Sequence, residues 1–197
     1  MSAYRIICVT NRRLAENDFL EQLEKIASAG VDAVILREKD LDIQAYENLA
    51  EYAAKICKRH QVPLILHTYA ETAERIGIRR IHLSYKDFES LNVQRRSRFD
   101  DIGVSVHSAE EAAAAWKAGA SCLTAGHIFA TDCKKGVLPR GLSFLEEICR
   151  SVRIPVYAIG GISPENAQSC IRAGAAGVCL MSSLMRAETP GDFLKRF

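Results

Sequence analysis

The sequence predicts an α/β protein, a (β/α)8 or TIM barrel that forms a single domain over residues 1–197. First, eight short apolar runs alternate with helical patterns, as repeated βα units do. Second, these runs are mostly apolar on both alternations, which is typical of parallel strands covered on both faces. Third, an Ala-Gly pair at a helix end precedes three of the runs, so the same unit recurs. A doubly wound sheet usually has a Gly-rich turn after its first strand, and VTNRRL has no glycine there.

The expected strands are rich in β-branched residues, which favour extended backbone. No linker rich in Pro, Gly or Ser divides the sequence into separate domains. In chain order the strands are Arg5–Thr10, Asp32–Arg37, Pro63–His67, Arg80–Leu83, Ile102–Ser105, Ser121–Gly126, Pro155–Gly160 and Gly177–Met181.

The helices between them show recognisable start and stop signals. Ser108 with Glu111 three residues later forms a capping box, and Pro164 takes the first helical position of another helix. The expected helices are Phe19–Ala29, Ala45–Arg59, Ala109–Ala118 and a segment that opens at Ser163 and closes at Gly174.

Composition and charge exclude several function classes. Hydrophobic residues make up 48% and charged residues 25%, and the net charge of +2 comes from interspersed signs. There is no basic stripe or helix-turn-helix pattern for nucleic acid. No stretch approaches the ~20 apolar residues that span a bilayer, and the N-terminus has no export signal. We therefore expect a cytoplasmic protein with no nucleic-acid or membrane partner; a homo-oligomer stays open.

The seven cysteines are expected to be reduced thiols. No pair has the C-x-x-C spacing of a metal or redox site. Most lie in apolar contexts such as RIICVT and GVCLMS, where a thiol packs as a small hydrophobe. Cys133 differs because it falls in a polar loop.

Polar residues gather where the expected strands end, and the loops at this end of a parallel barrel form active sites. Arg37, Glu38 and Lys39 end the second strand. An arginine there can hold a carboxylate or a phosphate through two hydrogen bonds, or the three residues can form an internally paired network. Other polar residues at strand ends are Thr10, His67, Thr68, Ser84, Ser105, His107, Thr131 and Lys134.

The last two strands end in patterns typical of a phosphate site. AIGGIS places Gly160 and Gly161 before a helix, and CLMSSL places Met181, Ser182 and Ser183 after the eighth strand. Glycine allows backbone N–H groups to approach an anion, and a helix N-terminus adds partial positive charge. A Gly-Gly pair alone also suits a tight turn, so the prediction rests on both loops together.

Five histidines are candidates for proton transfer. His60 is expected at the surface, His82 within packing with a satisfied ring, and His107 beside a helix cap. His67 and His127 directly follow strands, and histidine both takes and gives a proton near neutral pH. Position alone leaves His127 open between packing and chemistry.

Five motifs together carry a family resemblance: LREKD, GVSVHS, GHIFATDCKKG, IPVYAIGGISPEN and AAGVCLMSSL. Their order resembles that of the thiamine phosphate synthase superfamily, from the first strand almost to the C-terminus. Synthases of this superfamily carry Asn-Asp after strand three, where the aspartate helps to hold Mg²⁺, and Gly-Pro after strand six. Here these positions are His67-Thr68 and Gly126-His127, a pattern similar to the TenI-like thiazole tautomerase branch.

The resemblance implies a cofactor-free isomerase of thiamin biosynthesis with no metal site. It would convert a carboxythiazole phosphate to its aromatic tautomer by a 1,3-proton shift, with His127 as the catalytic residue. Its small-molecule partner would be a thiazole phosphate. The implied substrate-binding residues are Arg37, Glu38, Lys39, Ser105, Thr131, Lys134, Gly161, Met181, Ser182 and Ser183.

Two other functions stay open. One is thiamine phosphate synthase, which joins a pyrimidine pyrophosphate to thiazole phosphate; Thr68 counts against it because the expected carboxylate is missing, although Asp87 remains. The other is a regulatory protein that binds thiazole phosphate without turnover.

Overall fold

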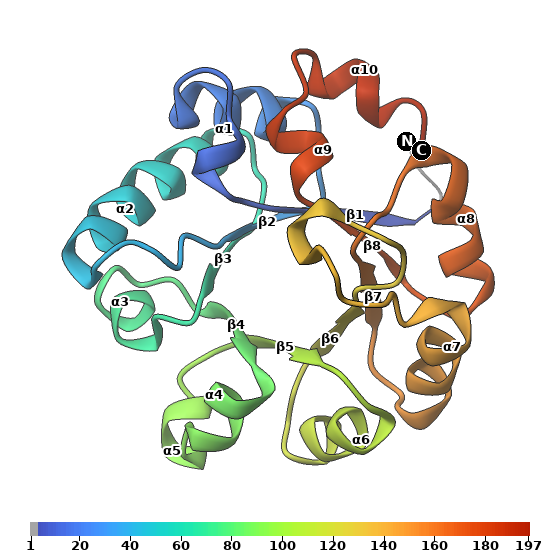
Figure 1. The fold of residues 1–197 in the computed structure, drawn as a ribbon. Coiled ribbons are helices and arrows are strands. Elements are labelled where there is room, and N and C mark those ends of the chain that lie inside the picture. Colours follow the sequence, from blue (N-terminus) through green and yellow to red (C-terminus); the bar gives the residue numbers. More distant parts are fainter. Residues whose placement is uncertain (1–3) are drawn as a thin grey trace. The chain divides into compact units, whose positions relative to one another are not determined.

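The computed structural model describes residues 4–197. Its strands pair in the order β1 to β8 and close into a barrel (Figure 1). Neighbouring strands run parallel, as in β2 and β3, where Ile35 lies opposite Ile65. These observations confirm the predicted (β/α)8 barrel. Two compact units are distinguished in the chain, residues 4–81 with 180–197 and residues 82–179. The single domain expected over 1–197 stays a prediction.

The first unit contains the start and the end of the chain, and its helices lie outside its strands (Figure 1). Helix α1 packs against α2 and against α10. The elements of this unit are β1 (Arg5–Val9), η1 (Arg12–Leu14), α1 (Phe19–Ser28), β2 (Ala33–Leu36), α2 (Ile43–Arg59), β3 (Leu64–His67), α3 (Ala70–Arg75), α9 (Ser182–Met185) and α10 (Pro190–Leu194).

Helix α1 illustrates how the sequence determines an element. The Asp18 carboxylate accepts hydrogen bonds from the backbone N–H groups of Leu20 and Glu21, which caps the helix start. The helix buries Leu23 and Ile26 completely. Burying one such side chain contributes roughly 1.5–3 kcal/mol, so packing of this face, more than the cap, stabilises the helix.

The second unit is continuous in sequence, and its strands pair in register from β5 to β8. Strands β4 (Arg80–Ser84) and β8 (Gly177–Leu180) each cross a boundary between the units. The other elements are α4 (Tyr85–Ser90), α5 (Val93–Arg96), β5 (Asp101–Val106), α6 (Ala109–Lys117), β6 (Cys122–Gly126), η2 (Asp132–Lys134), α7 (Gly141–Ser151), β7 (Val156–Ile159) and α8 (Pro164–Arg172).

All eight expected strands are present, and the four expected helices are also found. The short helices α3, α4 and α5 were not predicted, because four to six residues are too few to show a helical period. Helix α9, which begins at Ser182 after β8, was not predicted either.

Two further expectations concern cysteine and the membrane. The structure buries Cys8, Cys57, Cys170 and Cys179 and exposes Cys133, and none of the seven forms a disulfide. Within residues 4–197, no helix combines the length and the apolar character needed to traverse a bilayer. The cytoplasmic location stays a prediction.

Candidate functional site

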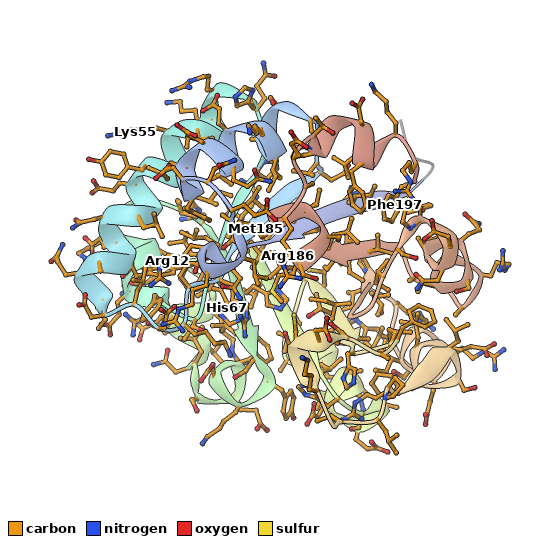
Figure 2. The ribbon with its side chains drawn as sticks, turned by 45° about the horizontal axis from the view of Figure 1, so that its top comes forward. Arg12, Lys55, His67, Met185, Arg186 and Phe197 are labelled. Carbon is orange, nitrogen blue, oxygen red and sulfur yellow. The ribbon has the colours of Figure 1, made fainter. Side chains whose placement is uncertain are left out.

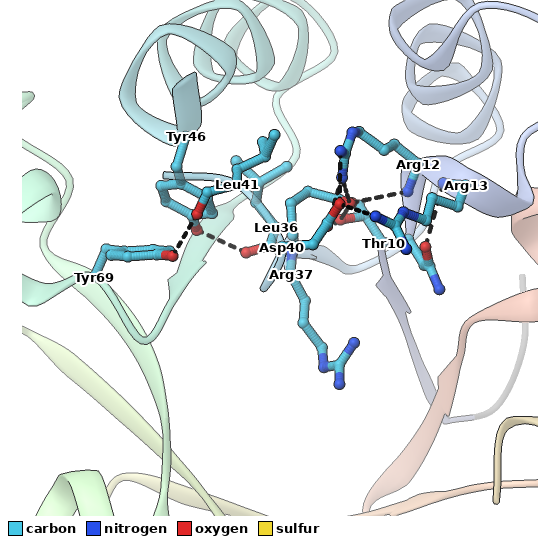
Figure 3. A network of polar contacts seen from close by, with 11 residues as sticks. Thr10, Arg12, Arg13, Leu36, Arg37, Asp40, Leu41, Tyr46 and Tyr69 are labelled. Carbon is cyan, nitrogen blue, oxygen red and sulfur yellow. Dashed lines mark hydrogen bonds and ion pairs between the residues drawn. The ribbon is translucent and has the colours of Figure 1, made fainter. Parts of the chain in front are cut away.

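In the first unit, Glu38 organises the ends of β1 and β2 through Thr10 and Arg12, which Figure 3 labels. Its buried carboxylate accepts a hydrogen bond of 2.7 Å from the Thr10 hydroxyl and bonds of 3.0 Å from the backbone N–H of Arg12. The Thr10 hydroxyl in turn accepts the backbone N–H of Arg37 at 2.9 Å. Glu38 was expected to bind substrate, yet its oxygens already serve the protein. Its observed role is to fix two strand ends.

Asp40, which is exposed, extends the ion-pair network of Glu38 and Arg12 toward the surface. The guanidinium of Arg12 donates to both oxygens of Asp40, at 2.6 and 2.7 Å, and Arg13 forms an ion pair with the same carboxylate at 2.7 Å. Hydrogen bonding from Arg12 lowers the pKa of Asp40 to about 2. The 3-10 turn η1 is therefore held to the loop after β2 by a bidentate pair.

Arg37 stands apart from this network. Its backbone is fixed by Thr10, but its side chain extends away from Arg12 and Asp40 (Figure 3). Among residues 4–197, the structure shows no hydrogen bond or ion pair of the Arg37 guanidinium. The internally paired network of Arg37, Glu38 and Lys39 that the sequence left open is thus not formed, because Glu38 pairs with Arg12 instead. Arg37 keeps its full capacity to bind an anion.

Tyr46 links the ends of β2 and β3. Its buried hydroxyl donates to the carbonyl of Leu36 at 2.7 Å and accepts the backbone N–H of His67 at 3.1 Å. Its ring lies against that of Tyr69, with centroids 4.3 Å apart, and the Tyr69 hydroxyl donates to Leu41. Burial raises the pKa of Tyr46 far above its usual value, so this hydroxyl keeps its proton.

His67 and Thr68 interact with each other. The Thr68 hydroxyl lies 2.6 Å from the His67 Nδ1, and Thr68 has a φ of 73°, in the left-handed region that a β-branched residue rarely adopts. His67 is buried, with 6% of its surface exposed. The Thr68 side chain is thereby directed to the histidine ring.

The residues predicted to bind phosphate after β8 lie at the start of α9. Met181 precedes this helix, and Ser182 and Ser183 are its first residues; all three are half-buried. Helix α9 contacts η1. Figure 2 shows Arg186, just after α9, toward the middle of the view and Lys55 at the outer side of α2.

In the second unit, a neutral polar cluster joins the middle of β4 and of β6 to a residue near the end of β5. The Nε2 atom of His82 lies 2.9 Å from the Ser105 hydroxyl and 3.1 Å from the Thr124 hydroxyl, and the two hydroxyls are 3.0 Å apart. His82 and Thr124 are buried, whereas Ser105 is half-buried. Burial lowers the pKa of His82 to about 4, so the ring is neutral at physiological pH.

His127 is also buried, with 4% of its surface exposed. Its Nε2 lies 3.2 Å from the carbonyl oxygen of Val137, and its own carbonyl accepts the backbone N–H of Arg140. Because a carbonyl oxygen only accepts, this contact requires the proton on Nε2. Nδ1 is then the basic nitrogen of the ring. His127 thus ties down the loop after β6, and its catalytic assignment stays a prediction.

That loop carries two further predicted residues. Thr131 accepts the backbone N–H of Cys133 at the start of η2, and Lys134 ends the same turn with an exposed side chain. Arg140 closes the loop by donating to the His107 carbonyl at 2.7 Å. Lys134 therefore projects from a segment that is fixed at both ends.

Gly160 and Gly161 follow β7 with φ angles of +99° and +66°. A Cβ atom on Gly160 would collide with His127, and one on Gly161 would collide with Ala130 and Phe129. The two glycines are needed for close packing against the loop after β6, whatever they bind. The phosphate site predicted from Gly161 together with Met181, Ser182 and Ser183 stays a prediction.

The sequence interpretation missed the residues that position the predicted ones. Tyr46 and Thr124 were not singled out, and His82 was treated as packing alone. A signal was present for the neutral cluster: small or polar residues occupy alternate positions of β4, β5 and β6, facing one side of the sheet. No comparable pattern indicates Tyr46, which lies in an ordinary helical stripe.

Comparison with known proteins identifies the family. Residues 6–184 match the family model described as thiamine monophosphate synthase. The chain belongs to this family. A thiamine-phosphate synthase of Clostridium acetobutylicum is 34% identical over 191 residues, which covers 96% of this chain and 90% of that protein. Thiamine-phosphate synthase 2 of Streptococcus pneumoniae is 34% identical over 189 residues, with coverage of 94% and 90%.

A solved structure agrees with the family. Thiamine phosphate pyrophosphorylase from Pyrococcus furiosus superposes with a TM-score of 0.83 at 26% identity, covering 98% of this chain and 93% of that chain. The predicted thiazole tautomerase activity, and with it the isomerase class, is therefore wrong: these relatives are named as synthases. The TenI-like branch is likewise not confirmed, although the superfamily is.

The error came from giving Thr68 and His127 too much weight. In phosphate-transfer sites Mg²⁺ keeps several waters and binds through the substrate phosphates, so one missing carboxylate does not exclude a synthase. The structure also gives His127 a contact in the loop after β6, which accounts for a histidine there without an isomerisation.

Proposed function

We propose that this protein is a thiamine-phosphate synthase, a transferase of thiamin biosynthesis that uses no resident cofactor. The observation that carries the proposal is the 34% identity to proteins of that name over more than nine tenths of the chain. In this reaction the ring nitrogen of thiazole phosphate forms a bond to the methylene carbon of a pyrimidine pyrophosphate. The bond from that carbon to the pyrophosphate oxygen breaks, and pyrophosphate leaves with the electron pair.

The departing pyrophosphate gains negative charge, so the reaction needs cations that are not already neutralised. Arg37 meets this requirement: among the described residues its guanidinium has no carboxylate partner, and Thr10 and Glu38 fix the backbone beside it. Lys134 is a second cation, exposed at the end of η2. We assign Arg37 to the pyrophosphate, and Lys134 is a second candidate for binding substrate.

The other predicted substrate residues take weaker roles. Lys39 and Thr131 are exposed or half-exposed groups beside these cations, and Ser105 supplies a hydroxyl at the end of β5. We assign the phosphate of the thiazole to backbone N–H groups and hydroxyls at Gly161, Met181, Ser182 and Ser183. Glu38 is a positioning residue, because its carboxylate oxygens are occupied by Thr10 and Arg12.

A resident magnesium ion does not fit the residues described. Residues 4–197 contain no cluster of three His, Cys, Asp or Glu side chains able to hold a metal. Asp87 is a single exposed carboxylate that accepts the Ser84 hydroxyl at 2.6 Å, and the Thr68 hydroxyl lies against His67. Any magnesium would therefore arrive with the pyrophosphate as part of the substrate, and the steps assigned to this chain involve side chains alone.

A catalytic role for His127 is a second, weaker proposal. With Nε2 protonated and held by Val137, Nδ1 is the nitrogen that could accept a substrate hydrogen bond. His127→Gln keeps a donor near Nε2 but lacks a basic nitrogen. Retained loop order with lost turnover would support catalysis, and retained turnover would leave the loop contact as its whole role.

The decisive experiment is synthesis of thiamine phosphate by the purified protein. Pyrimidine pyrophosphate, thiazole phosphate and magnesium chloride are incubated with it, and the product is quantified by chromatography. We expect a product with Arg37 intact and a loss of about a hundredfold in kcat/KM for Arg37→Met, because bidentate anion contacts are worth a few kcal/mol.

Lys55→Met is the matched control, since Lys55 projects from the outer side of α2, beside Tyr52 (Figure 2). It should leave kcat/KM unchanged. No product above the heat-inactivated background would overturn the synthase assignment. Binding of thiazole phosphate without turnover would point to a regulatory protein instead.

A further inference from the structure

The His82, Ser105 and Thr124 cluster has a geometry that ordinary packing does not require. Ser105 and Thr124 lie opposite each other in the register of β5 and β6, on one face of the sheet. Gly103, two residues before Ser105 on the same face, leaves room for the histidine ring: a Cβ there would lie 2.5 Å from the His82 Nδ1. Three strands thus bring one ring nitrogen and two hydroxyls within 3.1 Å of one another.

The number of protons shared among the ring nitrogen and the two hydroxyls depends on which nitrogen of the His82 ring is protonated. A neutral ring carries one proton, on Nδ1 or on Nε2. If Nε2 lacks the proton, both hydroxyl protons can be donated within the triangle, and Ser105 then presents only lone pairs outward. If Nε2 carries the proton, it donates to Thr124, Thr124 donates to Ser105, and the Ser105 proton is left for an outside acceptor.

Of the three residues in the cluster, Ser105 is the one that is only half-buried. His82 and Thr124 have 4% and 5% of their surfaces exposed, whereas Ser105 is half-buried at the end of its strand. Substrate at this strand end would therefore meet the Ser105 hydroxyl and neither of the other two groups. Whatever His82 contributes, it contributes through Ser105.

We propose that His82 is a positioning residue that carries its proton on Nε2 and so presents the Ser105 hydroxyl as a hydrogen-bond donor to a phosphate or pyrophosphate oxygen of the substrate. The ligand class rests on the proposed function, because phosphate oxygens only accept hydrogen bonds. The ring stays neutral throughout, since its pKa of about 4 lies well below physiological pH. No proton is transferred to substrate; the ring fixes the direction of one O–H bond.

The first test is a double-mutant cycle on the binding of inorganic pyrophosphate, measured by titration calorimetry. We expect Ser105→Ala and His82→Leu each to weaken binding about fivefold, the effect of one neutral hydrogen bond. In the Ser105→Ala background, adding His82→Leu should change the dissociation constant less than twofold. His82→Gln, whose amide N–H lies near the position of Nε2, should recover most of the affinity.

Independent effects of the two substitutions would overturn the proposal. Urea unfolding of each variant is the companion measurement, because a purely structural role would lower stability without the non-additive binding. Ser151→Ala, which removes a half-buried hydroxyl of the same unit that donates to the Ile148 carbonyl within α7, is the matched control and should leave pyrophosphate binding unchanged.

The second test uses the free protein and needs no ligand. Nitrogen-15 NMR of labelled histidine distinguishes the two tautomers, and we expect protonated Nε2 for His82 with a resonance that shifts in Thr124→Val. An unprotonated Nε2 would overturn the proposal even if pyrophosphate binds. If the wild type fails to bind pyrophosphate, the synthase assignment fails, and the NMR result alone judges the role of His82.

Discussion

The ends of β1 and β2 and the cluster on β4 to β6 are each held together by side-chain contacts, but with opposite chemistry. The former, which we call the charged rim, joins Glu38 and Asp40 to Arg12. The latter, the neutral rim, joins His82 to Ser105 and Thr124 without any ionised group. Each fixes the strand ends beside a residue that remains available for ligand, Arg37 in one case and Ser105 in the other. The charged rim positions the guanidinium of Arg37, and the neutral rim positions the O–H dipole of Ser105.

The largest effect is expected for Glu38→Ala in the charged rim. It should lower the free energy of unfolding by about 4 kcal/mol, because the Thr10 hydroxyl and the Arg12 backbone N–H lose a buried partner. Urea unfolding measures it. Glu47→Ala, which removes the carboxylate paired with Arg75 on the outer side, is the control and should have a much smaller effect. Equal losses would show that Glu38 does not organise the rim.

The second prediction distinguishes the two rims by how the free energy of unfolding depends on pH. His82 has a folded-state pKa of about 4, below the ~6.5 of an unfolded chain, so below pH ~6.5 the unfolded state binds a proton that the folded state does not. Stability from this group is complete above pH ~6.5 and is lost as the pH falls to about 4, in total about 3 kcal/mol. The pair of Asp40 with Arg12 should persist, because hydrogen bonding from Arg12 lowers the pKa of Asp40 to about 2.

The measurement is urea unfolding at intervals between pH 7 and pH 4. His82→Gln should flatten the dependence, while His107→Gln should preserve it, because His107 is exposed beside Glu111. An unchanged slope in His82→Gln would contradict the assigned pKa.

A smaller effect is expected for Thr124→Val in the neutral rim. This change removes one hydroxyl from a neutral network and keeps the shape, so it should cost about 1 kcal/mol. Thermal unfolding measures it, and Thr124→Ser should recover most of the loss. A loss as large as that of Glu38→Ala would mean that the two rims do not differ in the way described.

The smallest effect should come from Asp40→Asn. The pair with Arg12 and Arg13 is open to solvent, where Coulomb attraction is weak and screened by salt. Its urea midpoint should lie closer to the wild type than that of Thr124→Val, and 0.5 M sodium chloride should reduce the difference further. A larger loss than that of Thr124→Val would place part of the rigidity of the charged rim in its exposed pair.

The barrel was predictable from sequence because its signals are local and repeated. Each strand shows as an apolar run, and glycines such as Gly30 and Gly174 stop helices before strands with φ angles of +85° and +99°. The positions of Arg37 and Ser105 at strand ends followed directly from the strand boundaries, and Lys134 was correctly placed in the loop after β6.

The partners of those residues were not predictable, because they are set by contacts distant in sequence. Glu38 is paired with Thr10, 28 positions earlier, and His82 with Thr124, 42 positions later. No local sequence pattern indicates that the Glu38 carboxylate is bonded within the protein or that the Arg37 guanidinium is not. The function was misjudged for a related reason: single residues such as Thr68 were weighed without the contacts that account for them.

The hydrogen bonds of Gln22 have a consequence for synthesis on the ribosome. Its side-chain amide donates to the carbonyls of Leu184 and Ala187, at 2.8 and 2.9 Å, and the Tyr4 hydroxyl donates to the carbonyl of Phe197 at 3.4 Å. Residues 82–179 can find their partners while translation continues, whereas the Gln22 amide in α1 lacks these two acceptors until residues 184–187 have been made. A chain stalled before Leu184 would lack both acceptors of this amide, so a helix made early is completed by a segment made late.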